Sequence, residues 1–568
     1  MLAAVLLALC AVCSAAGDAG QWVRGGKEDR WRASPDGTCE AGPVVRSVSG
    51  VFRGAWLRSR RGRHFQAYRG IRYAEPPIGE LRFQPPKPIL TYPGEVDATQ
   101  DGPACTQTAP KGYPVDEDCL TINVYTPNNN SSKPLPVIFF IHAGGFYSMS
   151  GRSDIAGPHY LLDRDIVLVT INYRLASLGF LSLGNKLAPG NNGFKDQVAA
   201  LRWVRRNVAA FSGDPAQVTI AGYSAGSDSL MSHIISPMSK GLFHRGIAMS
   251  GALVTKDASP SARLDLAATQ ARLSGCPEHD AAALVHCLKS KPWQEVSGSL
   301  LGFYEFGFDP LSIWRPVVEP DFGQERFLAE DPLVSIREGR THTVPFIVSQ
   351  TTDEFFWKAY TIVKNKTMMD TMNAEWDRVA PIAFILPRNE SSERLARLRQ
   401  AYLGDKPIAD DETSSRALGK LYGDSLTGWP VHRLANLMCR HSKHPVYYYE
   451  FAYVGNHSHY EDPTTKKPVY AAHHDDLIYL FSLSYRYPMI DVADTHDSKM
   501  VDKMTAIWYN FARYGDPNPR GDTPELSSLR WPAMTPQQRN YLRLSSDTSV
   551  KQNMFEDRYK LWDELYPY

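Results

Sequence analysis

The chain has 568 residues, of which 43% are hydrophobic and 22% are charged. This is the composition of a globular protein, and a chain of this length can bury a large core. Its 62 lysines and arginines nearly balance its 61 aspartates and glutamates, leaving a net charge of +1. A nearly neutral chain gives no electrostatic reason to expect a nucleic acid partner.

The N-terminus resembles a secretion signal. Residues 2–13 form an apolar run too short to span a bilayer, and the small residues Ser14, Ala15 and Ala16 follow it. We expect a signal peptide over 1–16, although the usual positive start is missing. A polar, glycine-rich leader over 17–42 and a single domain over 43–568 should follow. No second apolar run reaches membrane-spanning length, so we expect a secreted, extracellular protein without a membrane span.

Short, continuous apolar runs recur along the domain. Such runs are typical of strands buried on both faces of a parallel sheet. Helical patterns lie between them, most clearly over Asp196–Phe211, where Val198, Leu201, Val204 and Val208 share one face. This alternation predicts a large, doubly wound, mostly parallel α/β sheet flanked by helices. The runs lie at 137–141, 166–171, 218–221, 247–249, 346–348 and 446–451.

The pentapeptide Gly222-Tyr-Ser224-Ala-Gly226 lies between one of these runs and a helix-compatible stretch over 227–235. In a strand–turn–helix context this pattern turns a serine into a nucleophile. The turn should strain the backbone at Ser224 and leave no room for side chains at the two glycines. The hydroxyl should stand exposed at the N-terminus of the following helix, where oxyanions are stabilised. The pentapeptide alone also arises by chance, so other residues must decide its meaning.

Acyl transfer further requires oxyanion donors, a base and an acid that orients the base. Gly144 and Gly145 follow the run at 137–141, and adjacent glycines allow two N–H groups to face one point. The base candidates are His473 and His474, on a loop before an apolar run, and spacing does not choose between them. The acid candidates are Asp353 and Glu354, just past a strand. Whichever residues act, the chain order is nucleophile, acid, base, as in α/β-hydrolases.

Outside the expected signal peptide the chain has six cysteines, for which 15 pairings exist. The short-loop choices are Cys105 with Cys119 and Cys276 with Cys287. Cys39 and Cys439 then remain, either free or joined to each other. Five asparagines head glycosylation sequons, and some of them should carry glycan on surface loops: Asn129, Asn130, Asn365, Asn389 and Asn456.

With these features in view, the sequence resembles the type-B carboxylesterases, the carboxylesterase/cholinesterase group, and most of all secreted arthropod esterases. The resemblance extends from about Val44 to Trp562. It implies the α/β-hydrolase fold and hydrolysis of carboxylic esters by a serine esterase. The segments that carry it, besides the pentapeptide, are Tyr68–Pro77, Glu117–Pro127, Ile171–Arg174, Asp196-Gln197, Asn207–Pro215 and Phe511–Pro519.

The resemblance also implies a role for each candidate. Ser224 would be the nucleophile, His473 the base and Glu354 the acid. The oxyanion donors would be the N–H groups of Gly144, Gly145 and Ala225. Ser250 matches a buried serine behind the nucleophile, and the family's two short-loop disulfides match Cys105–Cys119 and Cys276–Cys287.

Several positions depart from the family pattern. Ala143 replaces the first glycine of the oxyanion loop, and Phe355 and Tyr470 replace glycines beside the acid and the base. Tyr223 stands where cholinesterases have glutamate, and the segment before Cys119 lacks their choline-stacking tryptophan, which argues against quaternary ammonium substrates.

We therefore expect a small uncharged ester as substrate, without a metal or organic cofactor. The sequence does not indicate an oligomeric state. The alternatives are a non-catalytic, cholinesterase-like adhesion or signalling ectodomain and a lipase-type acylglycerol hydrolase.

Overall fold

The computed structural model describes residues 42–127, 133–253, 256–462 and 465–567. The expected signal peptide, the leader up to residue 41, Cys39, Asn129 and Asn130 lie outside the described residues. Asn365, Asn389 and Asn456 are all exposed. Cys105–Cys119 and Cys276–Cys287 are bonded in the structure, and Cys439 forms no disulfide with another described residue.

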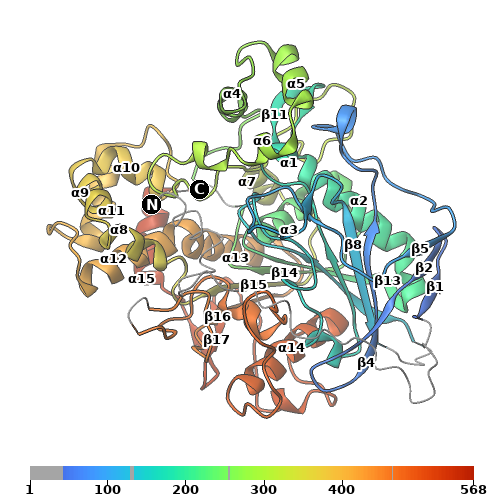
Figure 1. The fold of residues 1–568 in the computed structure, drawn as a ribbon. Coiled ribbons are helices and arrows are strands. Elements are labelled where there is room, and N and C mark those ends of the chain that lie inside the picture. Colours follow the sequence, from blue (N-terminus) through green and yellow to red (C-terminus); the bar gives the residue numbers. More distant parts are fainter. Residues whose placement is uncertain (1–41, 128–132, 254–255, 463–464, 568) are drawn as a thin grey trace.

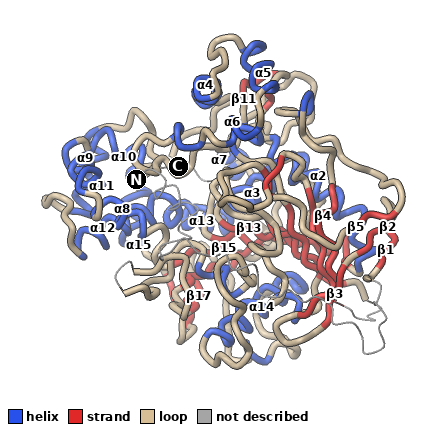
Figure 2. Tube along the Cα trace, in the orientation of Figure 1, coloured by secondary structure: helices blue, strands red, loops and turns tan. Residues whose placement is uncertain are grey.

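An 11-stranded sheet crosses the molecule (Figures 1 and 2). Every neighbouring pair from β10 to β17 is parallel, and the strands outside this block pair antiparallel. In spatial order the strands are β18 (Ser549–Gln552), β17 (Asn540–Leu544), β16 (Val446–Phe451), β15 (Phe346–Thr351), β14 (Arg245–Met249), β13 (Gly213–Tyr223), β9 (Leu135–Ile141), β10 (Val167–Ile171), β8 (Thr121–Pro127), β4 (His64–Arg72) and β3 (Ala55–Arg58).

The apolar runs of the sequence form β9, β10, β13, β14, β15 and β16, so the prediction of a mostly parallel sheet is confirmed. Successive residues of β9 point to opposite faces of the sheet. Phe139 packs in one hydrophobic cluster with α2 (Asn192–Asn207), α3 (Ala225–Ile235) and α13 (Trp429–His441). Ile138 packs in another with α14 (Asp497–Tyr514). Helices therefore cover both faces, as a doubly wound sheet requires.

The helix expected over 196–211 is α2, which begins earlier, at Asn192, and ends at Asn207 in a 3-10 turn over Val208–Phe211. The sequence did not predict the helical lobe around α8–α12 and α15, which has its own hydrophobic cluster. Its helices are α8 (Trp357–Val363), α9 (Lys366–Ala374), α10 (Trp376–Ala383), α11 (Ser392–Leu403), α12 (Glu412–Gly423) and α15 (Glu556–Leu565).

A second satellite cluster contains Cys276 and packs between short helices and loops at the top of the view in Figure 1. It includes α1 (Ala176–Phe180), α4 (Leu264–Leu273), α5 (Ala281–Ser290) and α6 (Trp293–Ser297), with α7 (Pro332–Arg337) nearby in the chain. Small accessory sheets are formed by β1 (Val44–Arg46), β2 (Val51–Arg53) and β5 (Glu95–Asp97), by β6 (Ala104–Cys105) and β7 (Val115–Asp116), and by β11 (Ser182–Asn185) and β12 (Ala188–Pro189).

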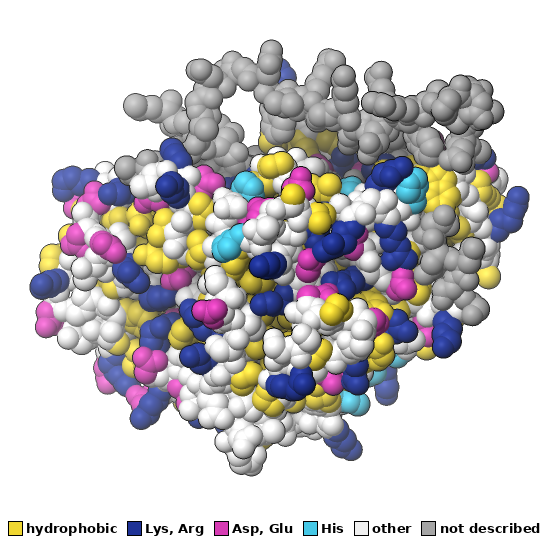
Figure 3. All heavy atoms as spheres, turned by 90° about the horizontal axis from the view of Figure 1, so that it is seen from below, with side chains coloured by type: hydrophobic (Ala, Val, Ile, Leu, Met, Phe, Trp, Pro, Cys, Tyr) yellow, Lys and Arg dark blue, Asp and Glu magenta, His cyan; other side chains and the backbone are white. Residues whose placement is uncertain are grey.

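On the face shown in Figure 3, basic and acidic side chains are interspersed, in keeping with the near-zero net charge. Within the described ranges, no helix combines the length and the apolar character needed to cross a membrane.

The turn between β13 and α3 depends on two close backbone approaches. A Cβ atom on Gly226 would stand 2.1 Å from the carbonyl oxygen of Ile141, and one on Gly222 would stand 2.0 Å from that of Gly226. Neither backbone can withdraw without breaking the sheet or the helix. The two glycines of the pentapeptide are therefore steric requirements of the fold.

We predict that Gly226→Ala lowers the melting temperature strongly or prevents folding, because overpacking against backbone costs at least about 1–3 kcal/mol. Gly521→Ala is the matched control, since nothing lies within 4 Å of its added Cβ. Thermal unfolding of both variants beside the wild type tests this, and equal melting temperatures for the two variants would contradict it.

Candidate active site

Ser224 lies between the last residue of β13 and the first residue of α3. Its backbone has φ 53° and ψ −119°, a conformation that a non-glycine residue adopts only under strain. Its N–H donates to the carbonyl of Met249 at the end of β14, at 2.8 Å. The residue is half-buried and lines a cavity, so it is less exposed than the sequence alone suggests.

The glycines after β9 also adopt the positive φ values that favour glycine, +107° at Gly144 and +58° at Gly145. Gly145 and Ala225 line the same cavity as Ser224, and Gly144 adjoins Gly145 in the loop. Among the described turns and loops, neither glycine N–H donates to a backbone carbonyl. The N–H of Ala225, the first residue of α3, belongs to the turn that has no partner within a helix. These groups can receive an oxyanion.

Glu354 and His473 are both buried, with 3% and 4% exposure. A direct hydrogen bond joins His473 Nδ1 to Glu354 Oε2. The other carboxylate oxygen accepts the N–H of Thr351 at 2.8 Å, which fixes its orientation. Asp353 instead pairs with Lys420 Nζ at 2.5 Å. Of the two acid candidates, the one that contacts the imidazole is therefore Glu354.

His474 has a different environment from His473. Its backbone has φ +83°, the left-handed region that favours glycine, which gives a reason why this position is often glycine in the group that the sequence resembles. Its N–H donates to the Tyr223 hydroxyl at 2.7 Å. Burial first, and then the neighbouring His473, His459 and Arg486, hold the pKa of His474 well below its usual range. A ring whose pKa is held so low is a weak proton acceptor, and the hydrogen bond from an imidazole to Glu354 comes from His473, so His474 does not fit the role of the base.

Phe355 has a position that the sequence left without a role. Its ring stacks on His473 with 4.0 Å between centroids and 29° between planes, while Tyr223 meets His473 edge-on at 5.1 Å. Phe355 also lines the cavity of Ser224, so it connects the imidazole with the nucleophile turn. Its φ of +50° explains the glycine in the family pattern. The sequence did contain a signal for Phe355: an aromatic residue stands beside the acid candidate, where the family pattern has glycine.

Ser250, the expected buried serine, has 1% exposure and lines the same cavity. It follows β14, and its N–H donates to Ser349 of β15 at 2.8 Å. The next residue, Gly251, approaches the nucleophile turn so closely that a Cβ there would lie 2.4 Å from the Ser224 carbonyl oxygen. The residues at and just after the end of β14 therefore pack directly against the turn that carries Ser224.

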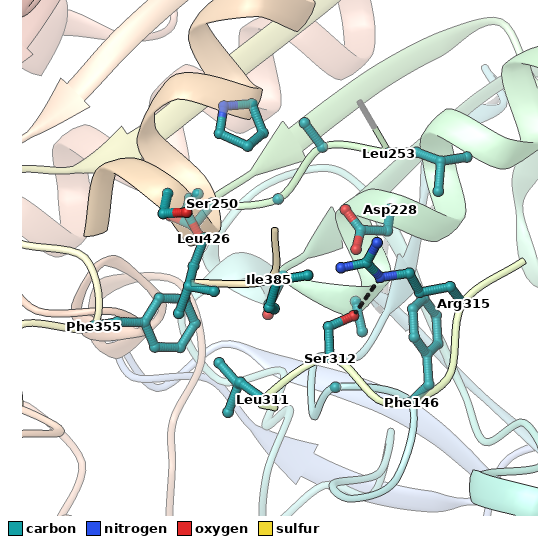
Figure 4. A pocket seen from close by; sticks show the side chains of 18 of the residues that line it. Phe146, Asp228, Ser250, Leu253, Leu311, Ser312, Arg315, Phe355, Ile385 and Leu426 are labelled. Atoms are coloured by element: carbon teal, nitrogen blue, oxygen red, sulfur yellow. Dashed lines mark hydrogen bonds between the residues drawn. The ribbon is translucent and has the colours of Figure 1, made fainter. Parts of the chain in front are cut away.

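The cavity in front of Ser224 is bounded by side chains from distant parts of the chain (Figure 4). Most are apolar, but Asp228, Lys256 and Arg315 are charged, and the sequence singled out none of them. Burial raises the pKa of Asp228 to about 7, opposed by the nearby Arg315. Burial also lowers the pKa of Lys256 to about 7. Asp228 lies on α3, four residues after Ser224, whereas Lys256 and Arg315 lie on loops that no sequence spacing connects with the site.

In the part of the chain that the structure describes, no group of three or more His, Cys, Asp and Glu side chains is arranged to hold a metal ion.

Comparison with known proteins places this geometry in a family. The model of the carboxylesterase family matches residues 41–562. A carboxylic ester hydrolase of Bombus ignitus is 33% identical over 91% of this chain and 93% of its own, and the juvenile hormone esterase of Tribolium castaneum is 35% identical over 84% of each. The crystal structure of juvenile hormone esterase from Manduca sexta, with OTFP covalently attached, is 28% identical and has a TM-score of 0.80, covering 92% of this chain and 99% of that one.

The chain belongs to the carboxylesterase family and has the α/β-hydrolase fold. It is a carboxylesterase, an ester hydrolase of the serine hydrolase type, and the resemblance in the sequence is confirmed.

The choice between the two acidic residues can be tested directly. We predict that Glu354→Gln lowers kcat by about 10²- to 10⁴-fold, because an amide no longer stabilises the imidazolium of His473. Asp353→Asn is the matched control and should remain near wild type, since its partner is Lys420. Steady-state hydrolysis of an aryl ester gives both values, and equal losses would contradict the assignment.

Asp228 should make stability depend on pH. Its pKa rises from an ordinary 3.8 to about 7 on folding. Between these values the folded chain keeps a proton that the unfolded chain releases, so this residue's contribution to stability falls as pH rises. Asp228→Asn removes the titration, so the stability of this variant relative to wild type should increase from pH 4 to pH 8. Chemical unfolding at pH 4 and pH 8 measures the free energy of unfolding of each variant, with the exposed Asp321→Asn as control. If the stability difference between Asp228→Asn and wild type is the same at both pH values, the prediction is refuted.

Proposed function

We propose that Ser224, His473 and Glu354 form a catalytic triad that cleaves carboxylic esters through an acyl-enzyme. The observation that carries the proposal is the buried hydrogen bond between His473 Nδ1 and Glu354. Phe355, which stacks on His473, lines the same cavity as Ser224, whose turn is strained. With Nδ1 bonded to the acid, Nε2 is the nitrogen left to take the hydroxyl proton.

In this mechanism His473 removes the proton of Ser224 as its oxygen attacks the ester carbonyl. The tetrahedral oxyanion accepts hydrogen bonds from the N–H groups of Gly144, Gly145 and Ala225, which need no rearrangement because loop and helix already fix them. His473 then gives its proton to the departing alcohol. Water, deprotonated by the same imidazole, hydrolyses the acyl-enzyme and restores Ser224. The residues supply every proton transfer, so no cofactor enters the proposal.

The likeness to the Manduca sexta esterase, whose structure has OTFP covalently attached, supports a covalent route. We further propose that the protein is secreted after removal of residues 1–16 and acts as a single domain over 43–568. The two bonded disulfides, Cys105–Cys119 and Cys276–Cys287, fit an oxidising compartment. The exposed sequons at Asn365, Asn389 and Asn456 would carry glycan there.

The substrate would be a small uncharged ester. The cavity contains the basic side chains of Lys256 and Arg315 against the single acidic side chain of Asp228, so it offers a quaternary ammonium group no net negative charge. Tyr223, at the position of the cholinesterase glutamate, adds no negative charge beside the nucleophile. Choline esters should therefore be poor substrates.

We predict that Ser224→Ala lowers aryl ester hydrolysis by about 10³-fold or more and leaves the melting temperature near wild type. An organophosphate should label Ser224 in the wild type and nothing in the variant. The exposed Ser392→Ala is the matched control and should keep full activity. Peptide mass spectrometry after labelling locates the adduct. If the label is found on another serine and the Ser224→Ala variant stays active, the proposal is wrong.

A further inference from the structure

A pair of opposite charges faces the cavity a short distance from the nucleophile. Asp228 lies one helical turn beyond Ser224, and its N–H donates to the Ser224 carbonyl at 3.0 Å. Residues four positions apart share a helix face, and one turn rises about 5.4 Å. Both side chains line the same cavity. The carboxylate of Asp228 therefore stands a few bond lengths from the position of a scissile carbonyl.

The carboxylate of Asp228 is incompletely satisfied. Its Oδ1 is shielded from solvent and has no hydrogen-bond partner among the described residues. Such an acceptor is costly unless something fills the site, because burial removes the water that would otherwise bind it. Burial raises the pKa of Asp228 to about 7 even though Arg315 opposes the rise. The folded protein thus leaves Asp228 Oδ1 available to accept a hydrogen bond from a bound molecule.

Arg315 comes from the loop that also carries Ser312 and lies beside Asp228 (Figure 4). In Figure 4 its guanidinium and the Asp228 carboxylate point toward one another, yet no hydrogen bond or ion pair joins them. The Arg315 Nε donates to Ser312 Oγ at 3.2 Å, and Nη1 lies 3.9 Å from Asp257. Ser312 thus fixes the guanidinium at the cavity wall, with donors left to face the space in front of Asp228.

The remaining wall offers little that could satisfy Asp228. It is largely apolar, with Phe146, Leu253, Leu311 and Leu426 among its members. The third charged residue, Lys256, already donates to the Ser425 carbonyl at 2.9 Å and its hydroxyl at 3.0 Å, and lies 5.2 Å from the Trp562 ring.

Charge balance then selects the kind of group that fits. A carboxylate on the substrate would bind Arg315 but would be repelled by Asp228. An ammonium group on the substrate would bind Asp228 but would be repelled by Arg315. A neutral group with one donor and one acceptor can donate to Asp228 and accept from Arg315 without adding charge to a partly buried site.

We propose that Asp228 and Arg315 form a selectivity site for esters that carry an uncharged hydroxyl or carboxamide group two to four bonds from the scissile carbonyl. The proposal rests on the ester hydrolysis at Ser224 proposed above, and it narrows the substrate class. Selectivity follows because a purely apolar substrate leaves Asp228 Oδ1 without a hydrogen bond and adds none to the guanidinium of Arg315. Hydrogen bonds to charged groups are among the stronger ones in proteins.

The test uses the full-length protein and isosteric pairs of esters. On the acyl side, 1-naphthyl 3-hydroxybutanoate is compared with 1-naphthyl 3-methylbutanoate, so that a hydroxyl replaces a methyl. On the alcohol side, 2-hydroxypropyl butanoate is compared with 2-methylpropyl butanoate. In at least one pair, kcat/KM should favour the hydroxyl ester by about 10- to 100-fold. Naphthyl esters of 3-aminobutanoic and glutaric acid, with an ammonium and a carboxylate, should both be poorer substrates.

Variants then assign the preference to the pair. Asp228→Leu and Arg315→Leu should each bring the hydroxyl-to-methyl ratio close to one or reverse it, mostly through KM. The exposed Arg202→Leu on α2 should leave the ratio unchanged. A wild-type preference for the methyl member of both pairs would overturn the proposal, and so would a preference for the charged esters or an unchanged ratio in folded variants. Normal turnover of the methyl esters without hydroxyl preference would refute the selectivity site alone, whereas no turnover of any ester would refute ester hydrolysis as well.

Discussion

The close approach of backbone to backbone at the turn between β13 and α3 is the constraint on which the site depends. The conformation at Ser224 costs about 1–3 kcal/mol, and it persists because the turn cannot relax. The Ser224 N–H is held by Met249 of β14, and Gly226 is in close contact with the carbonyl of Ile141 at the end of β9. Strands β9, β13 and β14 are parallel neighbours. Their carboxyl ends therefore meet at one edge of the sheet, where α/β proteins place their ligands.

The acid and the base reach that edge through a short extension of the same sheet. Beyond β15, Asp353 forms a parallel bridge with Ala472, and its N–H donates to Ala471 at 3.1 Å. The bridge aligns the two loops so that the residue after each partner, Glu354 and His473, forms the next contact. Asp475 secures the base loop from the other side by accepting the N–H of Ala472 at 2.9 Å. Backbone pairing thus sets the relative positions of the acid and the base of the proposed triad.

How far the sequence alone could go follows from the same physics. The buried parallel strands were visible because short, continuous apolar runs are typical of strands buried on both faces. The strands toward the two edges of the sheet, β3, β4, β17 and β18, gave no such run. Adjacent candidates were harder. Asp353 and Glu354 have the same chemistry and neighbouring positions, and only their contacts, with Lys420 and with His473, separate them. The lobe of α8–α12 and the cavity walls depend on loop packing, for which the sequence carries no periodic signal.

The charges that line the cavity affect both the proposed reaction at Ser224 and the choice of substrate. The N-terminus of α3 favours negative charge, so the same helix end that can hold an oxyanion at Ala225 also lies beside the carboxylate of Asp228. Two anions within one turn would compete, and the oxyanion would lose stability. Burial disfavours the ionised form of Asp228, and the positive charge of the neighbouring Arg315 offsets its negative charge, so both reduce that competition. A neutral substrate group between Asp228 and Arg315 would reduce it further, because it satisfies the carboxylate without bringing a charge toward Ser224. Binding of such a substrate and stabilisation of the transition state would then favour each other at one end of a single helix.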